Sequence, residues 1–167
     1  MSADDVDRIV DAWQRERPDL DVEPLHVLSR ISRLAKQHDR VRSSAFAQHG
    51  LEGWEFDVLA ALRRAGDPYE LTPGQLVAET LVTSGTMTTR VDRLIGRGLV
   101  LRRPDPRDRR GVLVQLTPSG RDVVDGALST LLTHEQRLVA ALSPKDRAVL
   151  PEMLRRLLLV ATDYNAR

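Results

Sequence analysis

Apolar residues recur every three or four positions along most of the chain, and this spacing places them on one face of an α-helix. In the first run, Val6, Ile9, Val10 and Trp13 fall on one side, and Pro18 ends the pattern. The periodicity predicts helices over residues 4–16, 24–50, 52–64, 84–96, 123–138 and 149–164, with a short helix after Thr72.

Three helix starts share one local signal, a hydroxyl residue followed by proline. The hydroxyl accepts from free N–H groups of the first turn, and proline takes the first helical position, where no N–H is needed. The pairs are Thr72-Pro73, Thr117-Pro118 and Ser143-Pro144, and Thr72 also forms a capping box with Gln75. Inside the last helix, Pro151 is expected to kink or split the element.

The periodicity changes after Gly98, where residues 99–102 and 112–116 favour two short strands. Residues 103–111 between them contain two prolines and a glycine. We expect these to exclude regular structure and to leave the arginines of this segment on a protruding loop. The two helices before Gly98 are joined by a tight turn, so they form a helix-turn-helix, and the hairpin that follows makes a winged helix.

The predicted fold is therefore all-α with a small β-hairpin wing, in a single chain of residues 1–167. A DNA-binding lobe is expected at residues 52–116. The helices at both ends, residues 1–50 and 117–167, have more apolar surface than a small winged-helix core can cover. This surplus favours a homodimer made by pairing both ends of the chain. The alternative is a monomer whose terminal helices fold back on the core.

Composition excludes several classes of protein. The 25 Lys and Arg against 24 Asp and Glu leave a net charge of +1, which fits neither a basic coat protein nor an acidic disordered tail. The chain contains no cysteine, which excludes disulfides, thiolate metal sites and thiol-based oxidant sensing. No apolar stretch approaches the roughly 20 residues that span a bilayer, and the acidic N-terminus is unlike a signal peptide, so we expect a cytoplasmic protein without a membrane partner.

Catalytic signatures are also missing from the sequence. It has no nucleophile elbow, phosphate loop or paired-carboxylate motif, and its four histidines lack metal-ligand spacing. We therefore expect neither an enzyme nor a bound metal or cofactor. A helical protein-interaction module without DNA binding is a further alternative, which the basic segment described next argues against.

Residues 83–121 contain nine arginines against three aspartates, although the whole chain is nearly neutral. A local basic block of this kind is typical of a phosphate-binding face, and the alternative is a solvated charged loop. On the helix over 84–96, small and hydroxyl residues point away from the core, and Asp105 and Asp108 are expected to hold the wing arginines in position. The predicted DNA-binding residues are Ser84, Gly85, Thr86, Thr88, Thr89, Arg93, Arg107, Arg109 and Arg110.

Four sequence segments resemble the MarR family of transcriptional regulators: TSGTMTTRVDRL at 83–94, RGLV at 97–100, DPRDRRG at 105–111 and LTPSG at 116–120. The resemblance covers residue 25 to about residue 158. It implies a homodimer of winged-helix lobes on a helical base that binds a palindromic double-stranded operator. Members of the family are usually repressors that a small molecule releases from DNA.

Arg90 falls at the edge of the buried helix face, where a partly desolvated guanidinium needs a counter-charge. Asp57 is a candidate partner, and Arg102 at the root of the wing is expected to converge on the same pocket. Together with Trp13, these residues resemble the effector residues of the urate-responsive, PecS-type branch of the family. Segments 13–21 and 55–59 also resemble that branch.

Two guanidiniums can bind a planar anion such as urate through paired hydrogen bonds, with an indole as an apolar wall. The alternatives are an ordinary Arg90–Asp57 ion pair, Arg102 on a DNA phosphate and Trp13 as a packing residue. Another aromatic or carboxylate anion, or no ligand at all, also fits the sequence. The operator, the regulated genes and the choice between repression and activation are left open.

Overall fold

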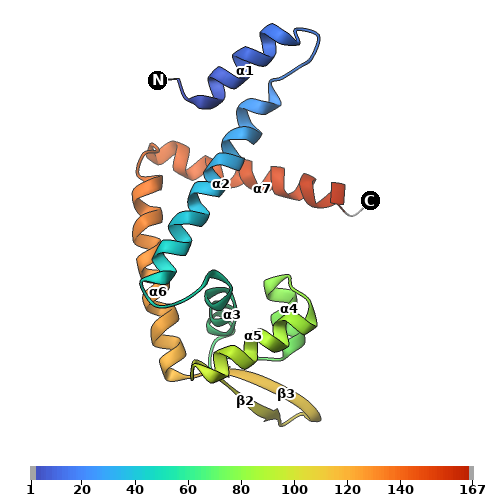
Figure 1. The fold of residues 1–167 in the computed structure, drawn as a ribbon, viewed down its shortest axis with the longest axis vertical. Helices are drawn as coiled ribbons and strands as arrows, with labels where there is room; N and C mark the ends of the chain where they lie inside the picture. Colours follow the sequence, from blue (N-terminus) through green and yellow to red (C-terminus); the bar gives the residue numbers. More distant parts are fainter. Residues whose placement is uncertain (1–2, 166–167) are drawn as a thin grey trace. The chain divides into compact units, whose positions relative to one another are not determined.

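The computed structural model describes residues 3–165, except for the side chains of residues 109, 110 and 163–165 (Figure 1). The chain divides into two compact units, residues up to Ala127 and residues from Leu128 onward. No helix among the described residues is long and apolar enough to cross a membrane. The elements are α1 (Asp5–Glu16), α2 (Pro24–Ala47), α3 (Gly53–Arg64), β1 (Glu70–Leu71), α4 (Pro73–Thr80), α5 (Ser84–Gly96), β2 (Val100–Asp105), β3 (Asp108–Leu116), α6 (Pro118–Val139) and α7 (Pro144–Asn165).

The predicted fold class is confirmed: helices dominate, and a small antiparallel sheet forms the wing. Helix starts follow the capping chemistry of the sequence. Thr72 caps α4 in a reciprocal capping box with Gln75. The Thr117 hydroxyl accepts from the N–H of Gly120 at 3.0 Å and donates to the carbonyl oxygen of Gly98 at 2.8 Å. The start of α6 is thereby fixed against the start of β2.

Gly120 also allows α6 to approach β2 closely. A Cβ atom at this position would lie 2.1 Å from the carbonyl oxygen of Leu99, which is far inside van der Waals contact. A side chain therefore cannot be accommodated unless the backbone of one element moves.

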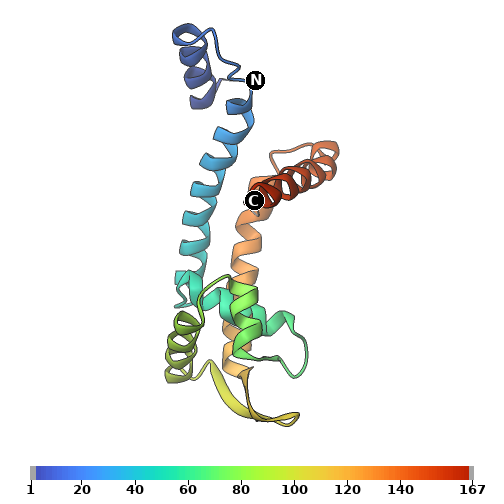
Figure 2. The same ribbon diagram turned by 90° about the vertical axis from the view of Figure 1, so that its right-hand side faces the viewer.

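The sheet has the strand order β1-β3-β2, and the two-residue β1 was not predicted from the sequence. The prediction of an irregular loop over residues 103–111 is wrong, because β2 continues to Asp105 and β3 begins at Asp108. Pro104 pairs with Val112 within the hairpin. The strand tolerates this proline because β2 is an edge strand, where the missing N–H faces away from the sheet. The hairpin projects from the lobe in both views (Figures 1 and 2).

The core of the winged-helix lobe is mainly aliphatic. Leu59 of α3, Leu76 of α4 and Met87 of α5 are completely buried. At the α2–α3 junction, the rings of Phe46 and Phe56 stack with their centroids 4.0 Å apart. This packing sets the position of α5 and the wing relative to α3.

Helix α1 packs on the N-terminal half of α2 through a separate small core of Val6, Val10 and Val22. An ionic clamp adds to this contact. The Arg30 guanidinium on α2 bonds Asp4 at 2.9 Å and Asp7 at 2.6 Å, the two carboxylates that cap α1. The hydrogen bond from Arg30 lowers the pKa of Asp4, and the backbone N–H of Asp4, followed by Arg30, lowers the pKa of Asp7.

We expect α1 to loosen from α2 as the pH falls below about 4. Carboxylates with a lowered pKa stabilise the fold above their ordinary pKa of 3.8, and this stabilisation is lost as they become protonated at lower pH. Amide hydrogen exchange of Val6 and Val10, compared at pH 6 and pH 3, measures the effect. Arg30→Met is the control, because it removes the clamp at both pH values. If α1 loosens equally at pH 3 in the unmodified chain and in Arg30→Met, the bonds from Arg30 to Asp4 and Asp7 do not hold α1 on α2.

In the second unit, Ser143 caps α7 by accepting from the N–H of Asp146 at 3.2 Å. Pro151 lies inside α7 without splitting it. A proline removes one N–H donor, and the carbonyl of Arg147 that loses its partner belongs to an exposed residue that water can reach. Leu158 on this helix is 67% exposed, which leaves an apolar face open to solvent.

Candidate nucleic-acid interface and effector site

Helix α5 presents one polar face to solvent. Met87, Val91 and Leu94 are buried in the lobe, and the opposite side is exposed, as the sequence pattern predicts. Small residues and hydroxyls occupy the first two turns, which allows close approach to a groove. The exposed residues include all the α5 members of the predicted DNA-binding set, Ser84, Gly85, Thr86, Thr88, Thr89 and Arg93.

The wing tip is the turn at residues 106–107. The Asp105 carboxylate accepts from the backbone N–H of Arg107 at 2.8 Å, so Asp105 holds Arg107 in place through the main chain. The Arg107 side chain is exposed. The side chains of Arg109 and Arg110 lie outside the described residues, and their DNA contacts stay predictions.

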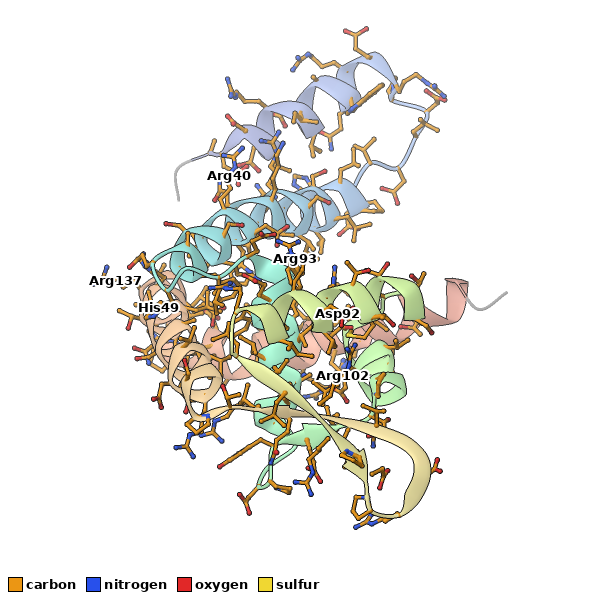
Figure 3. The ribbon with its side chains drawn as sticks, turned by 60° about the horizontal axis from the view of Figure 1, so that its bottom comes forward. Arg40, His49, Asp92, Arg93, Arg102 and Arg137 are labelled. Carbon is orange, nitrogen blue, oxygen red and sulfur yellow. The ribbon has the colours of Figure 1, made fainter. Side chains whose placement is uncertain are left out.

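An ion pair joins the recognition helix to the wing. Arg102 on β2 donates to the carboxylate of Asp92 on α5 at 2.6 Å, and the two labelled side chains meet in Figure 3. Arg103 pairs with Glu70 at 3.2 Å and ties β2 to the edge of β1. Because the Arg102–Asp92 pair is partly exposed, another anion can compete with Asp92 for the guanidinium.

A second cluster lies between α5 and the first turn of α3. The guanidinium of Arg90 lies over the Trp54 ring, 5.4 Å from the ring centroid, and that of Arg93 lies over the same ring at 4.8 Å. Glu52 accepts from the Trp54 indole N–H at 2.6 Å and pairs with Arg93 at 3.1 Å. The indole hydrogen bond, with the nearby Arg93, lowers the pKa of Glu52. We call these four residues the Trp54 cluster.

The counter-charge expected for Arg90 is paired elsewhere. Asp57 on α3 bonds Arg42 on α2 at 3.1 Å, and the Arg42 guanidinium also lies over the ring of Phe46 at 5.1 Å. The predicted Arg90–Asp57 contact is therefore wrong. Arg90 is stabilised by the neighbouring Trp54 ring instead, which a residue-by-residue reading of charges did not suggest.

Trp13 lies on α1 and is 49% exposed. Among the described residues, no hydrogen bond, ion pair or ring contact joins it to Asp57, Arg90 or Arg102. Those three residues come from α3, α5 and β2, which pack within the winged-helix lobe. The described contacts thus place three of the four predicted effector residues in one lobe and leave Trp13 on a helix that packs on α2.

An ion pair with one buried partner was not predicted from the sequence. Glu55 on α3 is 2% exposed, and Arg97 at the end of α5 bonds it at 2.6 Å. Arg97 further donates to the carbonyl oxygen of Gly50 at 2.9 Å. These bonds fix the C-terminal end of the recognition helix to the start of α3. The only sequence signal was the spacing of Glu52 and Glu55, which form the capping box of α3.

Comparisons with known proteins identify the family to which this fold belongs. The model of the MarR family matches residues 49–111. The transcriptional regulator PecS of Dickeya dadantii is 37% identical over 152 residues, which cover 91% of this chain and 92% of PecS. The chain belongs to the MarR family. It is accordingly a winged-helix transcriptional regulator rather than an enzyme.

Solved structures of MarR-family proteins agree with this assignment. A MarR variant from Escherichia coli in complex with operator DNA superposes with a TM-score of 0.68 at 30% identity, covering 82% of this chain and 95% of that one. BpsR of Bordetella bronchiseptica, whose DNA binding is regulated by 6-hydroxynicotinic acid, superposes with a TM-score of 0.65 at 29% identity, covering 78% and 91%. MarR-family regulators thus bind DNA and respond to ligands.

Proposed function

We propose that this MarR-family protein is a homodimeric repressor that binds a palindromic operator and is released by a small anion such as urate. One observation supports the DNA-binding geometry above all. The exposed hydroxyl-rich face of α5 and the wing are connected by the Arg102–Asp92 pair, so they act on DNA as one surface. Two such surfaces in a dimer would contact half-sites about 34–36 Å apart.

In this proposal α5 enters the major groove and the wing lies along the adjacent minor groove. Ser84, Gly85 and the threonines of α5 contact phosphates and base edges. Arg93 adds a positive charge to this face. Arg107, with Arg109 and Arg110, binds the negative potential of a narrow minor groove.

Exposed apolar faces support the homodimer, in which residues 1–50 and 117–167 form the dimerisation region. Leu28 and Leu34 on α2 are 52% and 48% exposed. On α7, Leu154, Leu157 and Leu158 are also exposed. Apolar faces of this extent are typical of surfaces that bury against a second copy.

Sedimentation of the purified chain tests this part of the proposal, and a monomer at micromolar concentration would contradict it.

The effector is proposed to bind Arg90 and Arg102 of the winged-helix lobe. The predicted roles of Asp57, which pairs with Arg42, and of Trp13 on α1 require these side chains to move toward that pocket when the ligand binds. An anion that draws both guanidiniums together competes with Asp92 for Arg102, and this loosens the connection between α5 and the wing. The ligand then favours a conformation in which the lobes no longer match the half-site spacing. A difference in affinity of a few kcal/mol between the two conformations is enough to release DNA.

Salt dependence of DNA binding tests the wing contact directly. Replacing Arg107 with Ala is expected to weaken binding and to reduce the slope of log K against log salt by about 1, because one phosphate contact is lost. Fluorescence anisotropy with a duplex from upstream of the gene measures both values. Arg15→Ala on α1 is the control, since this exposed arginine lies outside the proposed DNA surface. An unchanged slope in the Arg107 variant would contradict the contact.

A further inference from the structure

Two arginines of α5 share a single aromatic ring. Arg90 and Arg93 both lie over Trp54, with their guanidinium carbons 5.4 and 4.8 Å from the ring centroid. The proposed function gives them different tasks, since Arg90 binds the effector and Arg93 belongs to the DNA surface. One indole on α3 is therefore in contact with both proposed binding sites.

The cluster has few other stabilising contacts. Among the described residues, Arg93 pairs with the carboxylate of Glu52, whose other oxygen accepts from the Trp54 indole N–H at 2.6 Å. Among the described contacts, the Trp54 ring is what holds Arg90, because Asp57 is paired with Arg42. A cation is attracted to the negative face of an aromatic ring, and two cations near one ring also repel each other. The position of each guanidinium thus depends on the other.

We infer that Trp54 is a positioning residue that couples effector binding to DNA binding in the same lobe. The inference rests on the proposed function. An anion that binds Arg90 withdraws its guanidinium from the indole. Trp54 and its hydrogen-bonded partner Glu52 then readjust, and Arg93 moves relative to the exposed face of α5.

The coupling is reciprocal, because DNA and effector act on one shared contact. A phosphate that draws Arg93 away from Glu52 and Trp54 leaves the ring to Arg90 alone. The DNA-bound conformation therefore holds Arg90 more firmly on the indole and away from the anion. Effector affinity falls when DNA is bound, by the same factor by which DNA affinity falls when the effector is bound.

The test measures the coupling factor, which is the ratio of the Kd values for operator DNA with saturating urate and without urate. Coupling factors of about 5–150 are typical of allosteric proteins. Trp54→Leu is expected to reduce the factor at least about fivefold, because Leu keeps apolar volume without an aromatic face. Trp54→Phe, which retains a ring but loses the hydrogen bond to Glu52, is expected to give an intermediate factor.

Tyr69→Leu is a closely matched control. The Tyr69 ring also lies under two guanidiniums, those of Arg63 at 5.0 Å and Arg121 at 5.9 Å, but neither belongs to α5. Its coupling factor is expected to stay within about twofold of that of the unmodified chain. If the two Leu variants lose coupling equally, the effect is general loosening of the lobe and the inference is overturned.

Fluorescence gives a second readout that leaves Trp54 in place. The chain has two tryptophans, so Trp13→Phe makes Trp54 the single emitter. Its emission is expected to change when operator DNA binds, a response that does not involve the proposed effector role of Trp13. The Trp54→Phe chain, with Trp13 alone, is expected not to respond to DNA. An unresponsive Trp54 in a chain that binds operator DNA would overturn the inference.

The outcomes separate the inference from the proposed function. If the unmodified chain binds DNA and urate releases it, while Trp54→Leu retains the full coupling factor, the proposed function stands and the coupling role of Trp54 is wrong. If urate does not affect DNA binding by the unmodified chain, the proposed effector and the inference fall together.

Discussion

Replacing Arg97 with Met is expected to lower the free energy of unfolding by about 3 kcal/mol. Arg97 is the partner of Glu55, whose carboxylate is almost completely buried between α3 and α5. Met retains most of the apolar stem of the side chain but leaves this carboxylate without its cation. The backbone N–H of Glu52, which donates to Glu55 at 2.9 Å, replaces only part of the lost interaction.

Denaturant unfolding at a fixed protomer concentration measures this loss. Arg64→Met is the control, because Arg64 also pairs with a glutamate, Glu79 at 3.1 Å, but both of these side chains are more than half exposed. Such a pair contributes at most about 1 kcal/mol, so the control is expected to unfold close to the unmodified chain. Equal losses in the two variants would show that burial of Glu55 does not determine the stability of this junction.

Replacing Arg90 with Ala is expected to abolish the response of DNA binding to urate, with a change of at least about tenfold in the coupling factor. The guanidinium is proposed to bind the anion, and Ala supplies neither a charge nor a paired hydrogen-bond donor. Mobility shift with increasing urate measures the response. The Kd for DNA without urate is determined for the same variant, so that a change in basal affinity is not taken for a loss of response.

Arg121→Ala is the matched control for this experiment. Its guanidinium also lies near an aromatic ring, that of Tyr69, but on α6 rather than on the recognition helix. The control is expected to keep the full response to urate. If Arg90→Ala keeps it as well, Arg90 is not an effector residue and the anion binds elsewhere.

Sequence alone predicts the helices of this fold well. The extent of α5 was predicted closely, because Met87, Val91 and Leu94 follow one helical period and Gly98 ends it. The wing was predicted less well. Pro104 excludes a central strand, but the sequence does not show that β2 would be an edge strand, and only the pairing with β3 reveals it.

The site predictions are correct for positions along one helix and wrong for partners on different elements. The exposed face of α5 follows from one helical period, so each of its residues was assigned correctly to solvent. Partners across elements do not follow from periodicity. Asp57 and Trp54 lie one turn apart on α3, and the packing of α2 and α5 decides that the first meets Arg42 and the second meets Arg90.

The most direct test of this account is a mobility-shift titration on DNA from upstream of the gene, with and without urate. We expect a specific shift that a competing unrelated duplex does not remove and that urate reverses. A specific shift that is indifferent to urate would keep the regulator and contradict the proposed effector. The absence of any shift at low salt would contradict the central claim, that the α5 face and the wing form one DNA-binding surface.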